Sequence, residues 1–511
     1  MADVCGCYFW TMRFLSVVTC LGVLAAHAQV QLQWQHRFDA PNELTGFGDV
    51  GLGLDRRGDS LMVGHSWENF AQTTLFAADD GQVLWTMGTA DTVYHLGGRS
   101  FFGNTIVSGE RTASGNGISA RSSLIGLDGV LHWTVDAGLM NVQRLRGPLV
   151  NAAEDTAHVL AYGSGVLHDL RVDHIGSAGG WSYTPAHPWP GFETCLAADG
   201  SVIITAMVDL PGAFSDVPRL MRFDAAGAPT WSTWLADTTG FVVSAPARTV
   251  HWNADTLLSV HTTWQGLVQL RMTDADDGSV LWSFTDSLGL VLELASLAVV
   301  PEAQRIHVGL HGGTSIAYAP GAGRLWTDSV NAQANYMEVA VLANSAHAVS
   351  IVTDDRHIGQ GQDLHIRLLD PATGALVDTA WVNDTIGTHD LFENALLWGD
   401  ELHLLTAATF DTVSILNEST TLLLSTFNLA TPTALPGPKP SASPRTAVVT
   451  RGSIEAFLAP LLAPWTALDA AGRVHAVGSP ADLDAWYGTA PPGTYQVLGA
   501  GGRSRLMFIR P

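Results

Sequence analysis

A short hairpin recurs along this sequence, and each copy ends on a tryptophan. In the clearest copy, Leu75–Trp85, an apolar run enters the turn Asp79-Asp80-Gly81 and a second apolar run leaves it. Glycine after acidic turn residues supplies the positive φ that a tight or bulged hairpin turn needs. A lone hairpin is not stable in water, so the copies are expected to pack together in one fold.

The copies are evenly spaced along the chain. Four copies of Gly-x-x-x-Trp and one compressed copy are Gly81/Trp85, Gly129/Trp133, Gly227/Trp231, Gly278/Trp282 and Gly323/Trp326. With looser copies added, the series of tryptophans is Trp34, Trp85, Trp133, Trp181, Trp231, Trp282, Trp326 and Trp381. Successive members are 51, 48, 48, 50, 51, 44 and 55 residues apart. Such a period, built from short strands and glycine-rich turns, indicates a β-propeller with one four-stranded blade per repeat.

The two ends of the repeat region complement each other. The last repeat offers three strands between residues 395 and 430 and then stops, whereas the strand at 31–37 has no first half. Pairing these ends in one blade would close the ring and remove exposed sheet edges. The series therefore predicts eight blades. Seven is the alternative, because the repeats at Trp181 and Trp381 are loose.

The N-terminal segment has the pattern of a secretory signal peptide. Met12-Arg13 is followed by a 13-residue apolar run and then by Ala26-His27-Ala28. This pattern predicts cleavage between Ala28 and Gln29, with Met12 as a possible initiator. The apolar run is too short to span a bilayer, and no later run is longer, so no transmembrane segment is expected in the mature chain.

Charge and cysteine content exclude several classes of partner and site. The net charge is −23, but residues 431–511 carry +3 and include Lys439, the only lysine. The rest of the chain therefore carries −26, which would repel nucleic acid and anionic lipid. Cys195 is the only cysteine beyond the predicted signal peptide, so neither an internal disulfide nor a cysteine zinc site is expected.

The composition changes after the repeats. Residues 29–430 form the predicted propeller, and residues 431–450, which hold five prolines, form an extended linker. Residues 451–511 contain short β-like runs and the turn Asp469–Arg473, and they predict a small β-sandwich.

The hairpin unit resembles the repeat of the PQQ-like (quinoprotein-like) β-propellers, whose consensus is roughly Ala-x-Asp-x-x-Thr-Gly-x-x-x-Trp. Ala78–Trp85 and Ala275–Trp282 match it well, while Asp370–Gly374 carries the Thr-Gly but has Asp378 where tryptophan is expected. In that family the tryptophan docks against the neighbouring blade. The resemblance thus implies a docking role for the eight tryptophans of the series, and it is informative about fold rather than function.

The C-terminal segment combines the hairpin motif Asp469-x-x-Gly472-Arg473, a strand with Gly493 and Tyr495, and a basic terminal strand ending Arg510-Pro511. In these features it resembles the sorting domain of the Bacteroidota type IX secretion system. It departs from that domain in having Gly437-Pro438-Lys439-Pro440 where Pro-Asn-Pro is usual. The resemblance implies delivery through the periplasm to the outer cell surface or the medium, with the type IX secretion machinery as a partner. The residues that carry the motif are Asp469, Gly472, Arg473, Gly493 and Tyr495.

The sequence offers little catalytic chemistry. Residues 29–430 hold no lysine and no cysteine pair, which argues against a quinone cofactor, a P-loop and Schiff-base catalysis. His307 and His311 lie about 13 Å apart along a strand, too far to share a metal, and are interpreted as rim or channel residues. Asp274, Asp276 and Asp277 are interpreted as a turn rather than a calcium loop, because no ligating glutamate follows. No catalytic residue, metal or cofactor is predicted.

The expected function is therefore that of an exported, non-catalytic module that binds or scaffolds an unknown extracellular glycan or protein. Loops at 111–122 and 354–363 are the expected contact surfaces. The alternative is a secreted hydrolase or lyase that acts on a polysaccharide in the propeller funnel. Three or more converging Asp, Glu, His or Arg side chains in the funnel would favour the enzyme. An outer-membrane assembly scaffold is a third option, disfavoured because the residues before Cys20 are a poor lipobox.

Overall fold

The structure is a computed structural model that divides the chain into two units, Met1–Pro432 and Thr433–Pro511. In the first unit it describes residues 30–38 and 50–430, except 68–69, 90–92, 115–116, 139–140, 212–215, 237–246, 290–291, 331–338, 355–362, 383–388 and 410–419. In the second it describes 465–469, 474–478, 493–499 and 504–509. The signal-peptide residues Ala28 and Gln29, and the linker at 431–450, lie outside these ranges.

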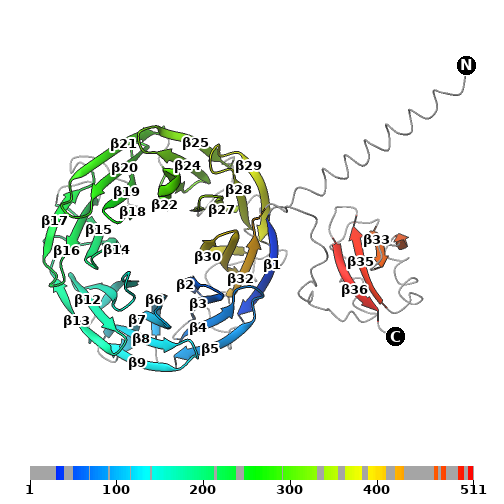
Figure 1. Cartoon of the computed structure of the whole chain (residues 1–511), viewed down its shortest axis with the longest axis horizontal. Helices are drawn as coiled ribbons and strands as arrows, with labels where there is room; N and C mark the ends of the chain where they lie inside the picture. Colours follow the sequence, from blue (N-terminus) through cyan, green and yellow to red (C-terminus); the bar gives the residue numbers. More distant parts are fainter. Residues whose placement is uncertain are drawn as a thin grey trace, which may run out of the picture. The chain divides into compact units, whose positions relative to one another are not determined.

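The first unit is an eight-bladed β-propeller, as the tryptophan series predicts (Figure 1). Each blade is a four-stranded antiparallel sheet, with its first strand next to the central opening and its fourth at the rim. The strands of blades one to four are β2 (Val50–Arg57), β3 (Ser60–Trp67), β4 (Phe70–Ala77), β5 (Val83–Thr89); β6 (Val93–Phe102), β7 (Thr105–Ser114), β8 (Gly117–Gly126), β9 (Leu131–Asp136); β10 (Val142–Val150), β11 (Ala157–Gly163), β12 (Val166–Asp173), β13 (Gly176–Tyr183); β14 (Gly191–Leu196), β15 (Val202–Val208), β16 (Val217–Phe223) and β17 (Pro229–Trp234).

Blades five to eight continue the pattern, with one short 3-10 turn, η1 (Pro301–Ala303), in blade six. Their strands are β18 (Arg248–Asn253), β19 (Thr256–Thr262), β20 (Leu267–Asp274), β21 (Val280–Ser287); β22 (Leu294–Val300), β23 (Arg305–Leu310), β24 (Thr314–Ala319), β25 (Gly323–Ser329); β26 (Val339–Ala343), β27 (Ala348–Asp354), β28 (Asp363–Leu369), β29 (Leu376–Val382); β30 (His389–Trp398), β31 (Glu401–Thr409), β32 (Thr420–Asn428) and β1 (Gln31–Phe38).

The eighth blade joins the two ends of the repeat region. β1 pairs antiparallel with β32, and Leu32 lies opposite Phe427 while Trp34 lies opposite Thr426. The Val30 backbone N–H also donates to Asp378 Oδ2 in blade seven at 2.8 Å. The prediction that the first strand completes the last blade is confirmed, and the ring has no open edge at this point.

The hydrophobic core lies between the blades. Side chains of a strand alternate between the two faces of its sheet, and both faces of an inner strand meet a neighbouring blade. All seven residues of β11, of β15 and of β19 are accordingly buried. One core cluster joins Leu160 of blade three to Ile204 of blade four. The rim strands alternate between exposed and half-buried residues because only one of their faces is covered.

Five of the eight tryptophans hold the next blade by a hydrogen bond. Trp34 Nε1 donates to Ala78 O at 3.0 Å, and Trp231 Nε1 donates to Ala275 O at 3.1 Å. The indoles of Trp85, Trp133 and Trp326 donate in the same way to carbonyls of Leu127, His174 and Pro371. The indole also covers the turn glycine of the next blade, where a Cβ on Gly81 would lie 2.5 Å from Trp34.

The other three tryptophans differ. Trp181 lies against Gly227 of the next blade, where a Cβ would come within 2.6 Å of the indole. Phe284, rather than Trp282, covers Gly323, because the turn of blade six is shorter. Trp381 is 44% exposed and stacks on His365 within its own blade. Asp378 takes its expected register position, opposite Leu368, as Trp85 lies opposite Leu75.

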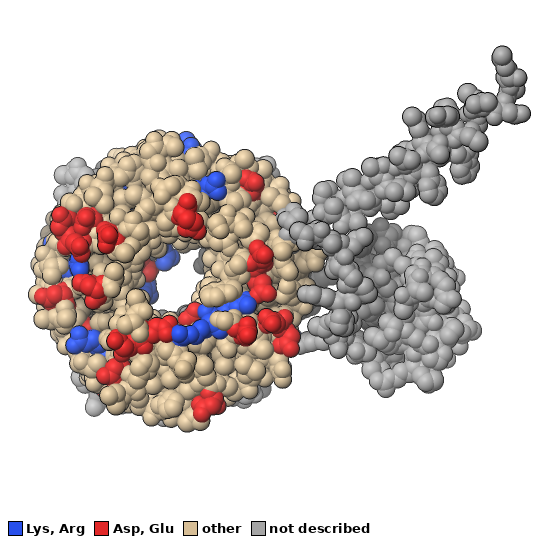
Figure 2. All heavy atoms as spheres, viewed as in Figure 1, with Lys and Arg blue, Asp and Glu red and all other residues tan. Residues whose placement is uncertain are grey.

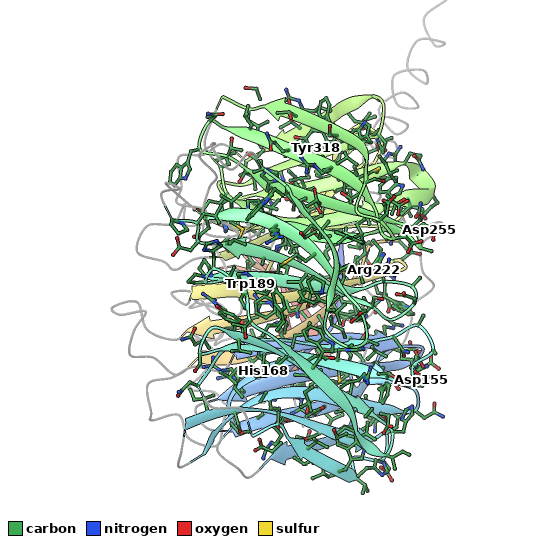
Figure 3. The ribbon with its side chains drawn as sticks, turned by 90° about the vertical axis from the view of Figure 1, so that its left-hand side faces the viewer. Asp155, His168, Trp189, Arg222, Asp255 and Tyr318 are labelled. Atoms are coloured by element: carbon green, nitrogen blue, oxygen red, sulfur yellow. The ribbon has the colours of Figure 1, made fainter. Side chains whose placement is uncertain are left out.

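The propeller has two different faces. One face carries the short turns that join the first strand of each blade to the second and the third strand to the fourth. We call it the turn face. It faces the viewer in Figures 1 and 2 and lies on the right in Figure 3, with Asp155 and Asp255 at its edge. The opposite, loop face carries the remaining connections, including the one with Trp189. The predicted loop at 111–122 is wrong for the described part of this range, because residues 111–114 belong to β7 and residues 117–122 to β8, while 115–116 lie outside the described residues. The predicted loop at 354–363 lies mostly outside the described residues.

The second unit is described only as a sheet. Its four antiparallel strands, in the order β34-β33-β35-β36, are β33 (Trp465–Asp469), β34 (Val474–Gly478), β35 (Gly493–Gly499) and β36 (Ser504–Ile509). β33 and β34 form the hairpin that the turn at 469–473 predicts. Asp469 ends β33, Gly493 and Tyr495 lie on β35, and Gly472 and Arg473 fall outside the described residues.

Candidate binding site in the central channel

Three charged side chains from successive inner strands meet in the central channel. Arg146 on β10 and Arg248 on β18 both bond to Oε1 of Glu193 on β14, at 3.4 and 3.3 Å. Their side chains are 36%, 38% and 20% exposed, in the order Arg146, Arg248, Glu193. Figure 2 shows basic and acidic side chains within the central opening. We call these three residues the channel triad.

The triad links four consecutive blades. Arg146 Nε donates to Phe192 O in the next blade at 3.1 Å, and Arg248 Nη2 donates to Ala295 O on β22 at 3.3 Å. The Arg146 guanidinium also lies 5.9 Å from the centre of the Phe192 ring. Part of the role of the triad is therefore structural, since its hydrogen bonds link the inner strands of four blades.

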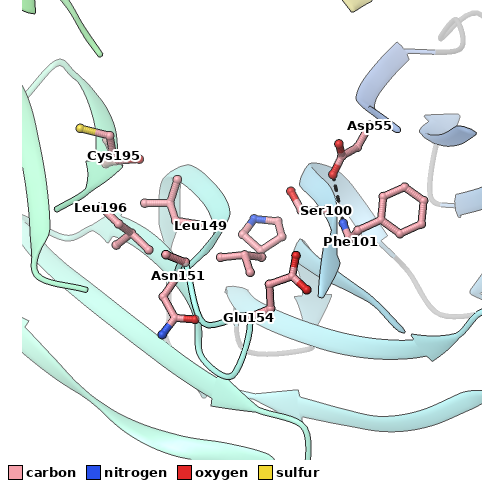
Figure 4. Close-up of a pocket in the computed structure, with 12 residues that line it drawn as sticks. Asp55, Ser100, Phe101, Leu149, Asn151, Glu154, Cys195 and Leu196 are labelled. Carbon is pink, nitrogen blue, oxygen red and sulfur yellow. Dashed lines mark hydrogen bonds between the residues drawn. The ribbon is translucent and has the colours of Figure 1, made fainter. Parts of the chain in front are cut away.

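A pocket of about 450 Å³ opens beside the triad, toward the turn face (Figure 4). It is lined by four successive inner strands, with Asp55 from β2, Ser100 from β6 and Thr194 from β14, and by Asn151 and Glu154 in the turn after β10. Pro148 and Thr194, which also line it, are two and one residues from Arg146 and Glu193 along their strands. The pocket is thus the mouth of the channel, and the triad lies deeper. We call it the mouth pocket.

The two carboxylates of the mouth pocket are already bonded within the protein. Asp55 accepts the backbone N–H of Phe101 at 3.0 Å (dashed in Figure 4) and that of Arg56 at 2.8 Å. Burial raises the pKa of Asp55, and these hydrogen bonds and the charge of Arg57 oppose the rise. Glu154 pairs with Arg57 at 2.5 Å. Asp55 and Glu154 therefore hold blades one, two and three together at the rim of the channel.

Cys195 lines the same pocket from the inner strand β14 and is partly buried. Burial raises the pKa of its thiol to about 12. The thiol is therefore protonated near neutral pH and is a poor nucleophile or metal ligand.

A second pocket, of about 570 Å³, lies on the loop face between blades three and four. The connection that contains Trp189 forms one wall, and Tyr162 OH accepts the Trp189 backbone N–H at 3.1 Å. Asp209 and Asp216 form another wall, and burial, followed by the charge of Asp209, raises the pKa of Asp216. Figure 3 shows Trp189 on the loop-face side.

The other residues singled out by the sequence do not assemble into a site. His307 is fully buried on β23 and packs against Trp326 with ring centroids 5.6 Å apart, so its assignment to the rim or channel is wrong. Asp274 Oδ1 accepts the backbone N–H groups of Asp276 and Asp277, as expected for a turn. Among the residues that the structure describes, no three His, Cys, Asp or Glu side chains gather as a metal site. No helix in that part of the chain is long and apolar enough to cross a membrane.

The channel triad was not predicted from the sequence. A signal was nevertheless present, because Arg146 and Glu193 are 47 residues apart and Glu193 and Arg248 are 55 apart. Both spacings are close to the repeat period, so equivalent positions of successive first strands bring the three side chains together. A search for charged residues at the repeat period could have found them.

Comparisons with known proteins support the fold alone. No protein-family model and no curated protein matches the sequence. Among solved structures, Sqt1 from Saccharomyces cerevisiae is similar at 13% identity and a TM-score of 0.51, over 77% of this chain and 98% of that one. BamB from Moraxella catarrhalis has 15% identity and a TM-score of 0.47, over 78% and 97%. Sqt1 from Chaetomium thermophilum, bound to the N-terminus of ribosomal protein L10, has 13% identity and a TM-score of 0.48, over 76% of this chain and 100% of that one.

Proposed function

We propose that this protein is an exported binding or scaffold module that engages an extracellular glycan or protein through its propeller. The channel triad is the observation that carries this proposal. It places two partly exposed guanidinium groups beside a polar pocket on a rigid, closed ring, and such concave sites with a few fixed polar groups are typical of binding sites. A β-propeller often serves as such a module, although the fold alone does not specify the ligand.

A screen of the full chain against glycan and protein arrays tests the proposal. We expect at least one ligand whose binding is saturable and weakened by changes in the channel triad. The absence of any saturable ligand, or binding that ignores every channel variant, would contradict it.

The route of export rests on the sequence. The pattern at residues 12–28 and the type IX-like motif at 468–495 support passage through the periplasm and delivery to the outer surface or the medium. The repeat motif in the same way supports a relation to the PQQ-like propellers. If the tail is the sorting signal, deletion of residues 431–511 will trap the protein in the periplasm, as measured by fractionation and surface proteolysis. Unchanged surface delivery would refute this role of the tail.

The polysaccharide hydrolase or lyase remains the second candidate. An enzyme was expected to bring three or more charged side chains together in the funnel. More than three do lie in the channel and its mouth. Asp55 and Glu154 face one pocket, and the raised pKa of Asp55 would suit a general acid. We favour binding because both carboxylates are engaged by protein donors and the triad has only one carboxylate. Hydrolysis of a polysaccharide that is lost in Asp55→Asn would reverse this preference.

A further inference from the structure

Resting on the proposed function, we infer that the channel triad and the mouth pocket form a binding site for a saccharide that carries carboxylate groups, such as a uronate oligomer. The arginines would bind the carboxylate, and the polar side chains of the mouth pocket would bind hydroxyl groups. The geometry of the triad, its charge and the lining of the pocket each support this assignment.

The arginines have hydrogen-bonding capacity that the protein does not use. A guanidinium carries five N–H groups. Among the described residues, Arg146 directs three of them to Phe192 O, Leu145 O and Glu193, and Arg248 directs two to Glu193 and Ala295 O. Both side chains are more than one-third exposed, although Arg248 Nε is buried without a partner in the described part of the chain, so a ligand would reach the remaining terminal N–H groups.

The bonds to Glu193 are weak for charged partners. Both arginines share one carboxylate oxygen at 3.3–3.4 Å, whereas a charge-assisted bond of this type is usually about 2.7–2.9 Å long. Two positive groups face one negative group, so the triad has a net charge of about +1. Arg144, exposed and two residues before Arg146 on β10, adds a further positive charge. A second carboxylate would therefore be attracted to the triad, although the body of the protein is acidic.

The mouth pocket favours a saccharide over an acidic peptide. Ser100 and Thr194 offer hydroxyl groups that can donate to and accept from sugar hydroxyls, whereas the Asn151 amide is mostly engaged within its own turn. Asp55 and Glu154 can accept from sugar hydroxyls as well, and a uronate ring carries hydroxyl groups beside its carboxylate, whereas the side chains of an acidic peptide carry none. The open centre in Figure 2 leaves room for a chain to enter from the turn face.

The test uses isothermal titration calorimetry of the full chain with tetragalacturonate and with its fully methyl-esterified form, which has the same backbone without charge. We expect the acid to bind at least tenfold more tightly than the ester. We expect R146Q and R248Q each to weaken binding of the acid about tenfold or more, since a hydrogen bond to a charged group is lost. The matched control R171Q, on β12 outside the channel, should bind as the unaltered protein does.

The variant E193Q separates ligand binding from a structural role. If Glu193 competes with the ligand for both arginines, E193Q will bind the acid several-fold more tightly even if it melts at a lower temperature. Equal binding of acid and ester, or weaker binding by E193Q, would overturn the inference. If another glycan or a protein binds through the channel but tetragalacturonate does not, this inference fails while the proposed function stands. If no ligand binds at all, both fail.

Discussion

Glycine and tryptophan form a matched contact between neighbouring blades. Gly227 has φ of +81° and lies against Trp181, whereas Gly200 has φ of +82° with nothing within 4 Å of the position of a Cβ. The two glycines share the backbone strain that an alanine would suffer, but only Gly227 has an indole to displace. A comparison of alanine variants at Gly227 and Gly200 therefore measures how much the crowding against the indole lowers the free energy of unfolding.

We expect Gly200→Ala to lower the free energy of unfolding by about 1–2 kcal/mol through backbone strain alone. Gly227→Ala should cost about 1–3 kcal/mol more, because the added methyl overpacks the contact with the indole. Equilibrium denaturation in urea measures both. Equal losses for the two variants would show that the indole yields without cost.

Buried histidines make the fold sensitive to mild acid. Burial lowers the pKa of His65 and His403 to about 3 and that of His261 and His307 to about 4. In the unfolded chain these groups titrate near 6.5, so below that pH the unfolded state binds more protons than the folded state. Stability is thus fully present above pH 6.5 and falls as the pH falls toward 4.

Each such histidine should cost up to about 1.4 kcal/mol per pH unit in that window. Denaturation measured at pH 7.5, 6.0 and 5.0 tests this, because carboxylates still contribute little there. We expect His307→Phe to reduce the slope and His132→Gln, at an exposed position, to leave it unchanged. A slope that no buried histidine variant alters would contradict the argument.

The acidity of the propeller originates in its turns. Aspartates such as Asp128, Asp199 and Asp224 accept the backbone N–H two residues further along. Arg222 then joins two turns, bonding Asp199 of its own blade at 2.6 Å and Asp276 of the next at 2.7 Å. These aspartates thus serve the geometry of the turns, and the acidic composition by itself identifies no substrate.

At the scale of elements, strand β1 makes contacts that are very distant in sequence. Gln35 Nε2 donates to Ser425 Oγ, 390 residues further along the chain. Its Trp34 is 9% exposed and bonded to Ala78, whereas Trp381 on β29 is 44% exposed. Both lie on rim strands, so they differ mainly in how much of the indole is exposed.

We expect Trp34→Ala to destabilise the propeller by about 3–5 kcal/mol and Trp381→Ala by less than about 1 kcal/mol. Thermal melts with tryptophan fluorescence as readout compare the two. Similar losses would mean that Trp381 has a packing role that its exposure conceals.

For the molecule as a whole, the sequence predicted the features that recur in every blade, whereas it did not predict the contacts that occur only once. The hairpin period indicated the blades, their number and the closing strand, because each repeat has to bury the same faces. The repeat consensus also marked Asp378 as standing where a tryptophan is expected. It did not indicate that Phe284, rather than Trp282, covers Gly323, since the shortened turn of blade six changes the register. The channel triad was missed because three distant residues form it, and each alone has the features of an ordinary surface residue.

The proposed absence of a quinone cofactor is also tested on the whole molecule. Residues 29–430 contain no lysine, and within the described chain Cys195 is the only free cysteine. We expect titration of the purified protein with pyrroloquinoline quinone and calcium to give no bound-cofactor absorbance. Stoichiometric binding would overturn the assignment as a non-enzyme, and the unrelated protein lysozyme serves as the blank.

The junction of β1 with β32 also bears on synthesis. A ribosome delivers β1 within the first forty or so residues, but its partner emerges only near residue 428. Throughout that interval the backbone N–H and C=O groups of β1 lack their partner strand, and an unpaired strand edge can pair with other chains. A truncated product lacks β32 and cannot complete the eighth blade. We therefore expect proteases to degrade truncated chains faster than chains that have closed the ring.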